Sequence, residues 1–371
     1  MTHMVSHGRR SFLKGIACGA VSPLIGGCRP EQVRRPVVAG IRNRFTFVSP
    51  LIDEEVRFRV VGDTHLTVND ARGDEFLQYT RRMGGASPES AAERKSFRAT
   101  LAAAKKSGDD LVALVGDQLS FPSPAGVEFL RGELDAADVP WLYTSGNHDW
   151  HYEGMPGTEA ELRAKYEPKI LKPLYADGVD PLAFTREVKG VRFVAIDDST
   201  NEILPEQLEY WRKEVSTGRP LVLLMHIPLY VPGYTVADGP VGHPEWGAAT
   251  DPYYLIERRP QWPEGHTAVT RAFRDEVFAA PNLIAVCTGH VHALQCATAE
   301  TGAVQLSCEA NRRDAAALEI TLLPSPRKNP PVEVLPVPEL KSQKEAFRPC
   351  RGCPQPSAAS VQGDEGKVSE W

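Results

Sequence analysis

The stretch "VPWLYTSGNHDW", residues 139–150, places a short apolar run directly before Asn147, His148 and Asp149. The apolar run predicts a buried strand, and the polar residues follow where that strand ends. Asparagine and aspartate are common turn residues, so the group taken alone is consistent with a turn and an incidental histidine. It is equally consistent with three side chains that converge on a site. The other strands of the chain decide between these two interpretations.

Further apolar runs predict buried strands elsewhere, and helical patterns lie between several of them. The predicted strands are residues 56–62, 111–116, 191–196, 220–225 and 282–288, followed without intervening helices by 303–308 and 316–323. One helix is expected to begin with Ser87 as its N-cap and Pro88 at its first position, and another at the capping box of Thr158 and Glu161. Such alternation is typical of an α/β fold with largely parallel strands, and the later strands indicate a pair of mixed sheets.

Polar side chains of similar kinds follow most of these strands, at the point where each strand ends. In chain order they are Asp63, Thr64 and His65, then Asp117, then Asn147, His148 and Asp149, then His226, and finally His290 and His292. Ligands bind at the carboxyl ends of the strands in open α/β sheets, so these side chains are expected to share one edge. Each motif alone has an ordinary structural explanation. Five of them at successive strand ends predict a site.

The five motifs are "DTH" (63–65), "GDQLS" (116–120), "GNHD" (146–149), the lone His226 and "GHVH" (289–292). Over about residues 58–293 they resemble the signature of the calcineurin-like metallophosphoesterases, which runs D-x-H, GDxxD, GNHD/E, His and GHxH. The resemblance implies a β-sandwich of two mixed sheets flanked by helices, with a dinuclear metal site at the carboxyl ends of the strands. It implies two sets of metal ligands that share Asp117 as a bridge: Asp63, His65 and His292 for one ion, and Asn147, His226 and His290 for the other.

The chemistry of such a site explains these residue types. Two cations about 3.5 to 4 Å apart can hold a phosphate between them and lower the pKa of a bridging water. Imidazole and oxygen ligands suit two divalent or trivalent ions such as Fe, Mn or Zn better than Mg or Ca. By resemblance, His148 is the catalytic residue that stabilises or protonates the leaving oxygen. We therefore expect hydrolysis of a phosphomonoester or phosphodiester in a small molecule or a phosphorylated substrate. The alternative is a non-catalytic, metal-stabilised binding module of the same fold.

One position departs from the family pattern. Relatives that carry GDxxD use the second aspartate to orient the catalytic histidine, but this chain has Ser120 there. Because serine carries no negative charge, either another carboxylate supports His148, or the pKa of His148 is lower and the activity weaker. Tyrosine at this position would have indicated a purple acid phosphatase, and Ser120 together with His65 argues against that branch.

The connection between His226 and His290 is long and rich in proline, glycine, tyrosine and tryptophan. Such a segment is more often a functional lid than a spacer, so we expect it to form part of the substrate wall. His151 and Tyr152, just after the "GNHD" turn, are further candidates for substrate contact. The candidates within the long connection are His243, Trp246, Tyr253, Tyr254, Arg258 and Arg259.

The first 28 residues resemble an export signal. "RRSFLK" (9–14) matches the twin-arginine pattern, and the apolar run after it is too short to span a bilayer. "IGGC" resembles the lipobox of a lipoprotein signal, with Cys28 as the lipidated residue; cleavage elsewhere, which would release soluble protein, is the alternative. We expect export by the twin-arginine machinery to a periplasmic or other extracytoplasmic location, with a lipid anchor in a membrane.

The remaining chain is expected to divide into a linker (29–50), a catalytic domain (51–323) and a tail (324–371). Nine of the 31 prolines lie in the tail, which predicts an extended or disordered segment. The formal net charge is −6 and no basic stripe is present, so a nucleic-acid-binding surface has no support. An oxidising compartment would permit a disulfide at one of two pairs, Cys296 with Cys308 or Cys350 with Cys353.

Overall fold

The computed structural model describes residues 35–77, 88–152, 157–175, 178–232 and 266–325. Every described residue belongs to one unit, which begins at Arg35. The proposed signal with Cys28, the long connection over 233–265 and most of the tail therefore lie outside the described residues. Among the described helices, none is long and apolar enough to cross a membrane.

The first of two sheets has six strands in the order β1-β2-β12-β3-β4-β5. β3, β4 and β5 run parallel, so their carboxyl ends point to the same edge. β12 lies between β2 and β3, parallel to the former and antiparallel to the latter. The strands are β1 Val37–Ile41, β2 Arg44–Ser49, β3 Val56–Val61, β4 Leu111–Val115, β5 Trp141–Thr144 and β12 Leu318–Pro324.

The second sheet also has six strands, in the order β10-β11-β9-β8-β7-β6. β11, β9, β8 and β7 run parallel, and the edge strands β10 and β6 are antiparallel to their neighbours. These strands are β6 Ala183–Val188, β7 Val191–Ile196, β8 Leu221–Leu224, β9 Leu283–Thr288, β10 Gln295–Thr298 and β11 Val304–Ser307. The prediction of two mixed sheets is confirmed.

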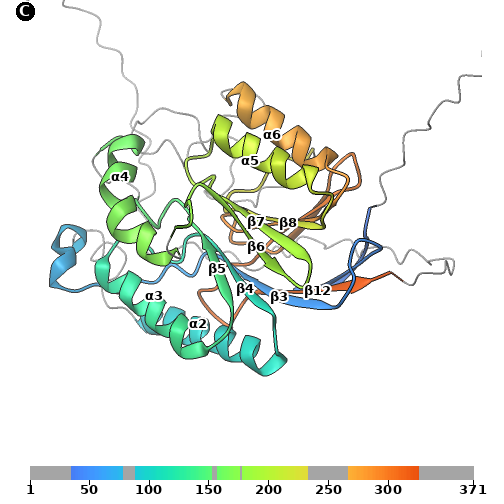
Figure 1. Cartoon of the computed structure of the whole chain (residues 1–371). Coiled ribbons are helices and arrows are strands. Elements are labelled where there is room, and N and C mark those ends of the chain that lie inside the picture. Colours follow the sequence, from blue (N-terminus) through green and yellow to red (C-terminus); the bar gives the residue numbers. More distant parts are fainter. Residues whose placement is uncertain (1–34, 78–87, 153–156, 176–177, 233–265, 326–371) are drawn as a thin grey trace, which may run out of the picture. The chain divides into compact units, whose positions relative to one another are not determined.

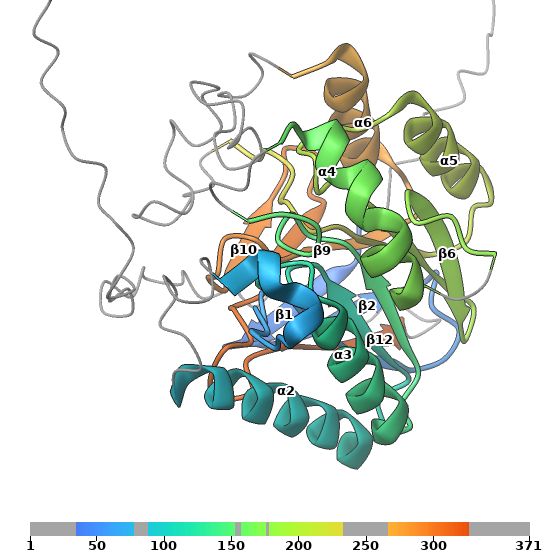
Figure 2. The same cartoon turned by 90° about the vertical axis from the view of Figure 1, so that its left-hand side faces the viewer.

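The two sheets pack face to face, and helices cover their outer faces (Figures 1 and 2). β4 shows how the sequence produces these layers, because successive side chains of a strand point to opposite faces. Leu111, Ala113 and Val115 contribute to the apolar core between the sheets. Val112 and Leu114 belong to a second core beneath the helices. A strand buried on both faces must be apolar throughout, which explains its continuous hydrophobic run.

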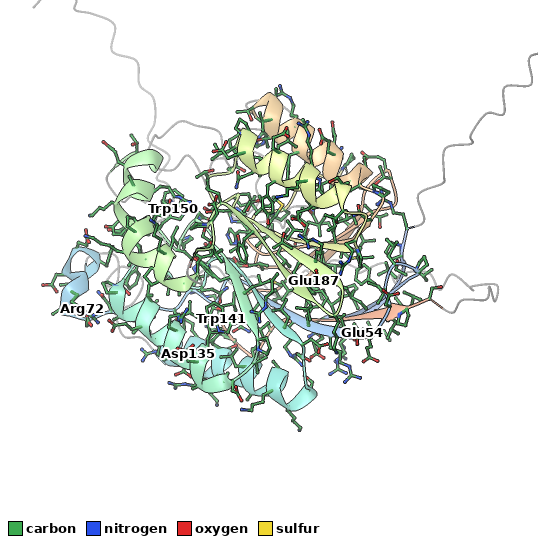
Figure 3. The ribbon with its side chains drawn as sticks, in the orientation of Figure 1. Glu54, Arg72, Asp135, Trp141, Trp150 and Glu187 are labelled. Carbon is green, nitrogen blue, oxygen red and sulfur yellow. The ribbon has the colours of Figure 1, made fainter. Side chains whose placement is uncertain are left out.

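The helices lie in two groups. α2, α3 and α4 share an apolar core with the outer face of the first sheet, and α5 and α6 share another with the second sheet. Figure 3 shows Arg72 and Asp135 on the helical side of the first sheet, Glu187 on the edge strand β6 and Trp150 beside α4. The helices are α2 Pro88–Ser107, α3 Pro124–Ala137, α4 Glu159–Tyr166, α5 Pro205–Ser216 and α6 Ala268–Ala279, with short turns η1 Ala71–Phe76, η2 Glu167–Leu171 and η3 Lys172–Leu174.

The predicted helix starts agree with the structure. α2 begins at Pro88, although Ser87 lies outside the described residues. At α4, the Thr158 hydroxyl accepts from the Glu161 backbone N–H, and the Glu161 carboxylate accepts from the Thr158 backbone N–H. This reciprocal pair is the predicted capping box.

The expectation of a linker over residues 29–50 is wrong for its second half. Residues 37–49 form the antiparallel hairpin of β1 and β2, and β2 pairs with β12 in the first sheet. Phe45 and Phe47 alternate with more exposed residues and are buried between the sheets. This alternation of period two identifies a half-buried strand rather than a linker.

Candidate metal centre

The carboxyl ends of strands from both sheets meet at one place, where backbone hydrogen bonds join the connecting loops. The Asp63 N–H donates to the Gly116 carbonyl at 3.1 Å, and the His65 N–H donates to the Asp117 carbonyl at 3.0 Å. On the second sheet, the Gly289 N–H donates to the His226 carbonyl at 2.9 Å. Backbone bonds therefore fix the loop after β3 to that after β4, and the loop after β8 to that after β9.

The backbone at the predicted ligands is unusual. Five of them have positive φ angles: Asp63 (54°), His65 (50°), Asp117 (51°), His290 (69°) and His292 (53°). Residues other than glycine rarely adopt this left-handed region, and those that do cluster at functional sites. Here the left-handed turn at each strand end directs the next side chains toward the common centre.

Two glycines make room for the ligands. A Cβ atom on Gly146 would lie 2.2 Å from Asp117 Oδ1 and 2.3 Å from the Asp117 backbone nitrogen. Gly116 has a φ of 82°, and a Cβ atom there would lie 2.5 Å from His226 Nδ1. The glycine of "GD" and the glycine of "GNHD" are therefore required by close approach between neighbouring loops.

Asp63, His65 and His292 form the first group of potential ligands, with ligand atoms within 4.8 Å of one another. The Nε2 atoms of His65 and His292 are 3.0 Å apart, and His292 Nε2 is 3.3 Å from Asp63 Oδ1. The backbone N–H of His290 donates to both Asp63 oxygens, at 3.0 and 2.9 Å. This last contact orients the Asp63 carboxylate, which follows a strand of the first sheet, through a loop of the second sheet.

Asp117, His226 and His290 form the second group. His226 Nε2 lies 3.2 Å from each of three atoms: Asp117 Oδ2, Asn147 Oδ1 and His290 Nδ1. The other ring nitrogen, His226 Nδ1, is 2.8 Å from the Val115 carbonyl, which fixes the ring and directs Nε2 into the centre. Asn147 therefore joins this group through its amide oxygen.

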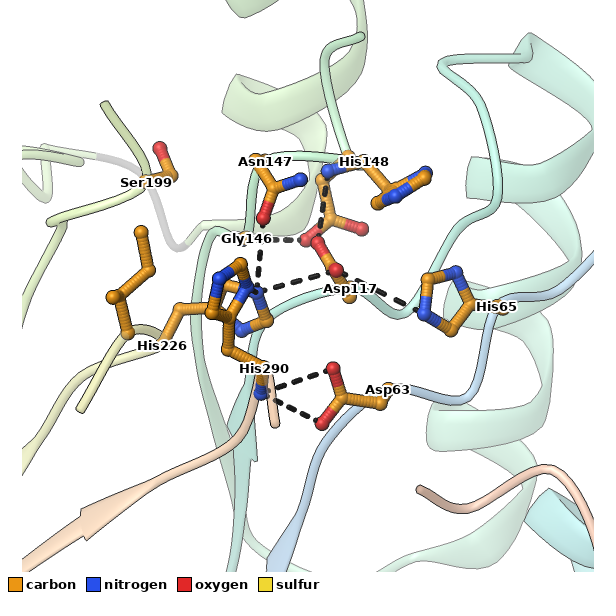
Figure 4. Close-up of polar contacts among 12 residues, drawn as sticks. Asp63, His65, Asp117, Gly146, Asn147, His148, Ser199, His226 and His290 are labelled. Atoms are coloured by element: carbon orange, nitrogen blue, oxygen red, sulfur yellow. Dashed lines mark hydrogen bonds and ion pairs between the residues drawn. The ribbon is translucent and has the colours of Figure 1, made fainter. Parts of the chain in front are cut away.

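Asp117 lies between the two groups, with His65 on one side and His226 on the other (Figure 4). Its Oδ2 atom is 3.2 Å from His226 Nε2 and 3.8 Å from His65 Nε2, and its Oδ1 atom accepts from the His148 backbone N–H at 2.8 Å. The structure therefore brings together all seven residues of the predicted ligand set, with Asp117 at the bridging position.

The electrostatics of the centre favour bound cations. Burial and the charge of His148 lower the pKa of His65 well below its ordinary value, which favours the neutral imidazole that metals bind. Burial opposes ionisation of Asp117, but the charges of His226 and His148 outweigh it and lower its pKa well below the usual range. Burial likewise opposes a charged His226, but Asp117 raises its pKa to about 10. The centre therefore attracts positive charge beside the Asp117 carboxylate.

These donors fit two metal ions of the kind the family binds. Imidazole nitrogens converge in pairs, His65 with His292 and His226 with His290, and each pair faces carboxylate or amide oxygen. Two imidazoles at hydrogen-bond distance cannot both be protonated without repulsion, whereas a cation between them would satisfy both. Asp63, His65 and His292 would hold one ion, Asn147, His226 and His290 the other, and Asp117 both.

His148 contacts the backbone at Ser120. Its Nδ1 atom is 3.3 Å from the Ser120 carbonyl oxygen, and its ring makes an edge contact with His65 at 4.8 Å. The Ser120 hydroxyl points elsewhere, donating to the His65 carbonyl at 2.8 Å. The Ser120 backbone carbonyl therefore faces the His148 ring, a contact that needs no particular side chain at position 120.

Asp149 fixes the turn that carries Asn147 and His148. Its carboxylate accepts from the backbone N–H groups of Leu119 and Gly146 and from the Tyr143 hydroxyl, each at 2.8 Å. Burial, with the nearby charge of Asp117, raises the pKa of Asp149 to about 7. Asp149 is thus a positioning residue for the turn, as its place in "GNHD" indicated.

Sequence reasoning missed two aspartates at the end of β7. Asp198 accepts from the backbone N–H of His226 at 2.9 Å and of Ile227 at 3.1 Å, and burial raises its pKa to about 7. Asp197 pairs with Arg163 of α4 at 2.8 Å. A signal was present, because "DDS" follows a buried strand just as "DTH" and "GDQ" do. Both aspartates hold neighbouring loops rather than joining the ligand groups.

Other predicted residues have different outcomes. His151 is buried with Nδ1 2.7 Å from the Asn147 carbonyl, and the buried Tyr152 ring packs against Phe76, so their contacts favour a structural role.

Cys296 and Cys308 are free thiols, so the disulfide permitted between them is not formed. The following candidates lie outside the described residues: Cys28, His243, Trp246, Tyr253, Tyr254, Arg258, Arg259, Cys350 and Cys353.

Solved structures with similar folds include several phosphatases. A dimetal phosphatase from Danio rerio is 13% identical with a TM-score of 0.44, covering 71% of this chain and 92% of its own. A purple acid phosphatase from yellow lupin (Lupinus luteus) seeds is 13% identical with a TM-score of 0.46, covering 76% and 56%. A phosphopantetheinyl hydrolase from Mycobacterium tuberculosis is 14% identical with a TM-score of 0.36, covering 75% and 100%. No curated protein matches this sequence significantly.

The family comparison agrees with the residues of the centre. The model of the calcineurin-like phosphoesterases matches residues 56–294, which is more than half of the chain and contains every residue of both ligand groups. This chain therefore belongs to the calcineurin-like phosphoesterase family, whose members are metal-dependent hydrolases with dinuclear sites.

Proposed function

We propose that this chain is a dinuclear metal-dependent phosphoesterase that hydrolyses phosphomonoester or phosphodiester bonds. The observation that carries the proposal is the position of Asp117, whose carboxylate lies between two groups of ligands from two different sheets. A pair of sites that shares one carboxylate is the arrangement that binds a phosphoryl group between two ions. Imidazole with oxygen ligands favours Fe, Mn or Zn as the bound pair.

The residues of the centre have different proposed roles. Two bound cations would polarise the phosphoryl group and lower the pKa of a water molecule between them. Asp63, Asp117 and Asn147 supply oxygen ligands, and the two carboxylates balance part of the cationic charge. The backbone N–H of His290 and the Val115 carbonyl hold Asp63 and His226 in place, so the ligands are positioned before substrate arrives.

His148 is the proposed proton donor to the leaving oxygen. Its ligand atom lies within 4.8 Å of those of His65 and Asp117, next to the first group of ligands. Because Nδ1 faces the Ser120 carbonyl, the proton for the leaving oxygen would come from Nε2. His148 is buried, so water has little access to this proton before substrate binds.

The test uses full-length protein reconstituted with Mn, Fe or Zn and assayed on paired para-nitrophenyl and bis-para-nitrophenyl phosphates. Asp117→Asn removes the bridging charge and is expected to lower kcat/KM at least about a hundredfold. His148→Ala is expected to lower kcat by about 10² to 10⁴ while metal content is kept. Full activity of Asp117→Asn would contradict the dinuclear assignment. Hydrolysis of neither ester by metal-replete protein would favour the binding module.

We also propose that the protein is exported by the twin-arginine machinery and anchored through Cys28. The support is the "RRSFLK" and "IGGC" patterns, together with a metal centre that folding in the cytoplasm would allow to load before transport. Cys28→Ser is expected to move the protein from the membrane fraction to the soluble fraction of cells. Continued membrane attachment of that variant would show that the anchor is elsewhere.

A further inference from the structure

The loop after β11, residues 309–317, is fixed beside the metal centre. Ala310 bridges to Gly62, and the Asn311 N–H donates to the Gly62 carbonyl at 3.0 Å, one residue before Asp63. The Asn311 side chain donates to Thr100 Oγ1 of α2 at 2.8 Å. A segment tied on one side to β3 and on the other to α2 places its next residue, Arg312, at the edge of the centre.

Arg312 is a cation with unused hydrogen-bonding capacity. Within the described part of the chain its ionic partner is Glu93 of α2, at 3.7 Å, which is beyond hydrogen-bond distance. The Arg312 side chain is 28% exposed, whereas that of Glu93 is 4% exposed. Guanidinium groups present five donors in a fork that matches carboxylate or phosphate oxygens. Glu93 thus holds Arg312 in position, and among the described residues the guanidinium donors remain available.

Two observations place Arg312 on the flank of the first ligand group. Glu93 also accepts from the Thr67 hydroxyl at 3.3 Å, two residues after His65. Burial and the charges of His148 and His292 lower the pKa of His65, and the positive charge of Arg312 contributes in the same direction. Through Glu93 and Asn311, Arg312 is therefore held beside the first group of ligands.

We propose that Arg312 is a specificity-determining residue that binds an anionic group of the substrate separate from the phosphoryl that reacts. The inference rests on the proposed function and deepens it. A phosphoryl group bound between the two ligand groups would leave its ester substituent beside the first group, which Arg312 flanks through Glu93 and Thr67. The preferred substrates are phosphate esters whose leaving group carries a carboxylate or a second phosphate. Charge-assisted bonds to either anion are stronger than those between neutral groups.

The test compares matched aryl phosphates on Mn-reconstituted full-length protein, as wild type and as Arg312→Gln. Phenyl phosphate carries only the reacting phosphoryl, para-carboxyphenyl phosphate adds a carboxylate, and hydroquinone bisphosphate adds a phosphate. Loss of one charge-assisted contact is expected to lower kcat/KM for the last two about tenfold, mainly through KM, and that for phenyl phosphate less than about threefold. The ester with the larger fall identifies the anion that Arg312 binds.

Control variants separate this role from general charge or stability. Arg313→Gln, in the same loop, is expected to keep the wild-type preference, and Arg312→Lys to keep part of it, because lysine retains the charge but not the fork. An equal fall in kcat/KM for all three esters would overturn the proposal, as would an equal effect of Arg313→Gln.

Binding of matched phosphonates decides the proposal without turnover. Calorimetry with phenylphosphonate and para-carboxyphenylphosphonate is expected to show that Arg312→Gln weakens only the second, about tenfold. Equal weakening, or none, would overturn the role of Arg312 even if hydrolysis is observed. Selective weakening without hydrolysis of any ester would support the anion site and count against the proposed function.

Discussion

The buried ion pair between Arg163 and Asp197 gives a stability prediction that can be worked out from the structure. Arg163 Nη1 donates to Asp197 Oδ2 at 2.8 Å and to Ser199 Oγ at 2.9 Å, and the guanidinium lies 5.4 Å from the centre of the Trp150 ring. The side chains are 11% and 2% exposed. Arg163→Met keeps most of the apolar stem but leaves the Asp197 carboxylate without its cation.

The expected cost follows from what remains around Asp197. Removing one partner of a buried pair costs about 3 to 5 kcal/mol because an uncompensated charge is left behind. Ser145 Oγ still donates to Asp197 at 2.6 Å and the Ser199 N–H at 2.9 Å, so the lower end applies. We therefore expect the free energy of unfolding to fall by about 3 kcal/mol at neutral pH.

The cost should depend on pH in a defined direction. Burial acts to raise the pKa of Asp197, but in the wild type Arg163 and the two serines outweigh it and lower the pKa. Asp197 therefore stabilises the fold above its unfolded pKa, and this contribution is lost as pH falls through the lower folded pKa. Without Arg163, burial raises the pKa of Asp197 in the folded variant. As pH falls toward about 4, the carboxylate becomes protonated, and the cost of its uncompensated buried charge disappears. The difference between variant and wild type should shrink over that range.

The assay is urea unfolding of metal-depleted full-length protein, followed by tryptophan fluorescence at about pH 7 and about pH 5. Arg98→Met is the matched control, since its bond to Glu133 is largely exposed and is expected to contribute less than about 1 kcal/mol. Arg163→Met with Asp197→Asn should recover part of the loss. A cost below about 1 kcal/mol at neutral pH, or a cost that does not change with pH, would refute the reasoning.

Three further predictions concern the centre. Ser120→Ala is expected to keep kcat/KM within about threefold, because His148 contacts the backbone carbonyl of residue 120 and not its hydroxyl. The free energy of unfolding should fall by about 1 kcal/mol, since only the hydroxyl bond to the His65 carbonyl is lost. A large loss of activity would show that the hydroxyl supports catalysis. Gly146→Ala should displace Asp117, so metal analysis and the ester assay should show a lower metal content and at least about a hundredfold less activity. Chelation should lower the free energy of unfolding by at least about 3 kcal/mol, seen as a lower urea midpoint, and an unchanged midpoint would contradict tight metal binding.

The sequence predicted the parts of the fold that local patterns encode. Six apolar runs became buried strands, and the polar residues after five of them meet at one edge, because the carboxyl ends of parallel strands must lie together. The hairpin of β1 and β2 was missed although the alternation at Phe45 and Phe47 was readable. It lies within residues 29–50, which we expected to be a linker.

What the sequence could not predict depends on contacts between distant residues. Arg163 and Asp197 pair across 34 positions, and Arg312 reaches Glu93 only because the loop after β11 is tied to both β3 and α2. No periodicity marks such contacts. Ser120 is a different case, because the sequence shows that a carboxylate is missing but carries no signal for the backbone carbonyl that contacts His148.

The left-handed backbone at Asp63, His65, Asp117, His290 and His292 sets stability against activity. Each such residue costs on the order of 1 kcal/mol relative to a conformation it prefers, and glycine would remove that cost. A selection for greater thermal tolerance of the metal-free chain would therefore favour glycine at these five positions, the same changes that abolish metal binding. Thermostable variants should be sought elsewhere in the chain. Natural relatives with glycine at these positions are expected to have lost hydrolytic activity and to have a more stable fold.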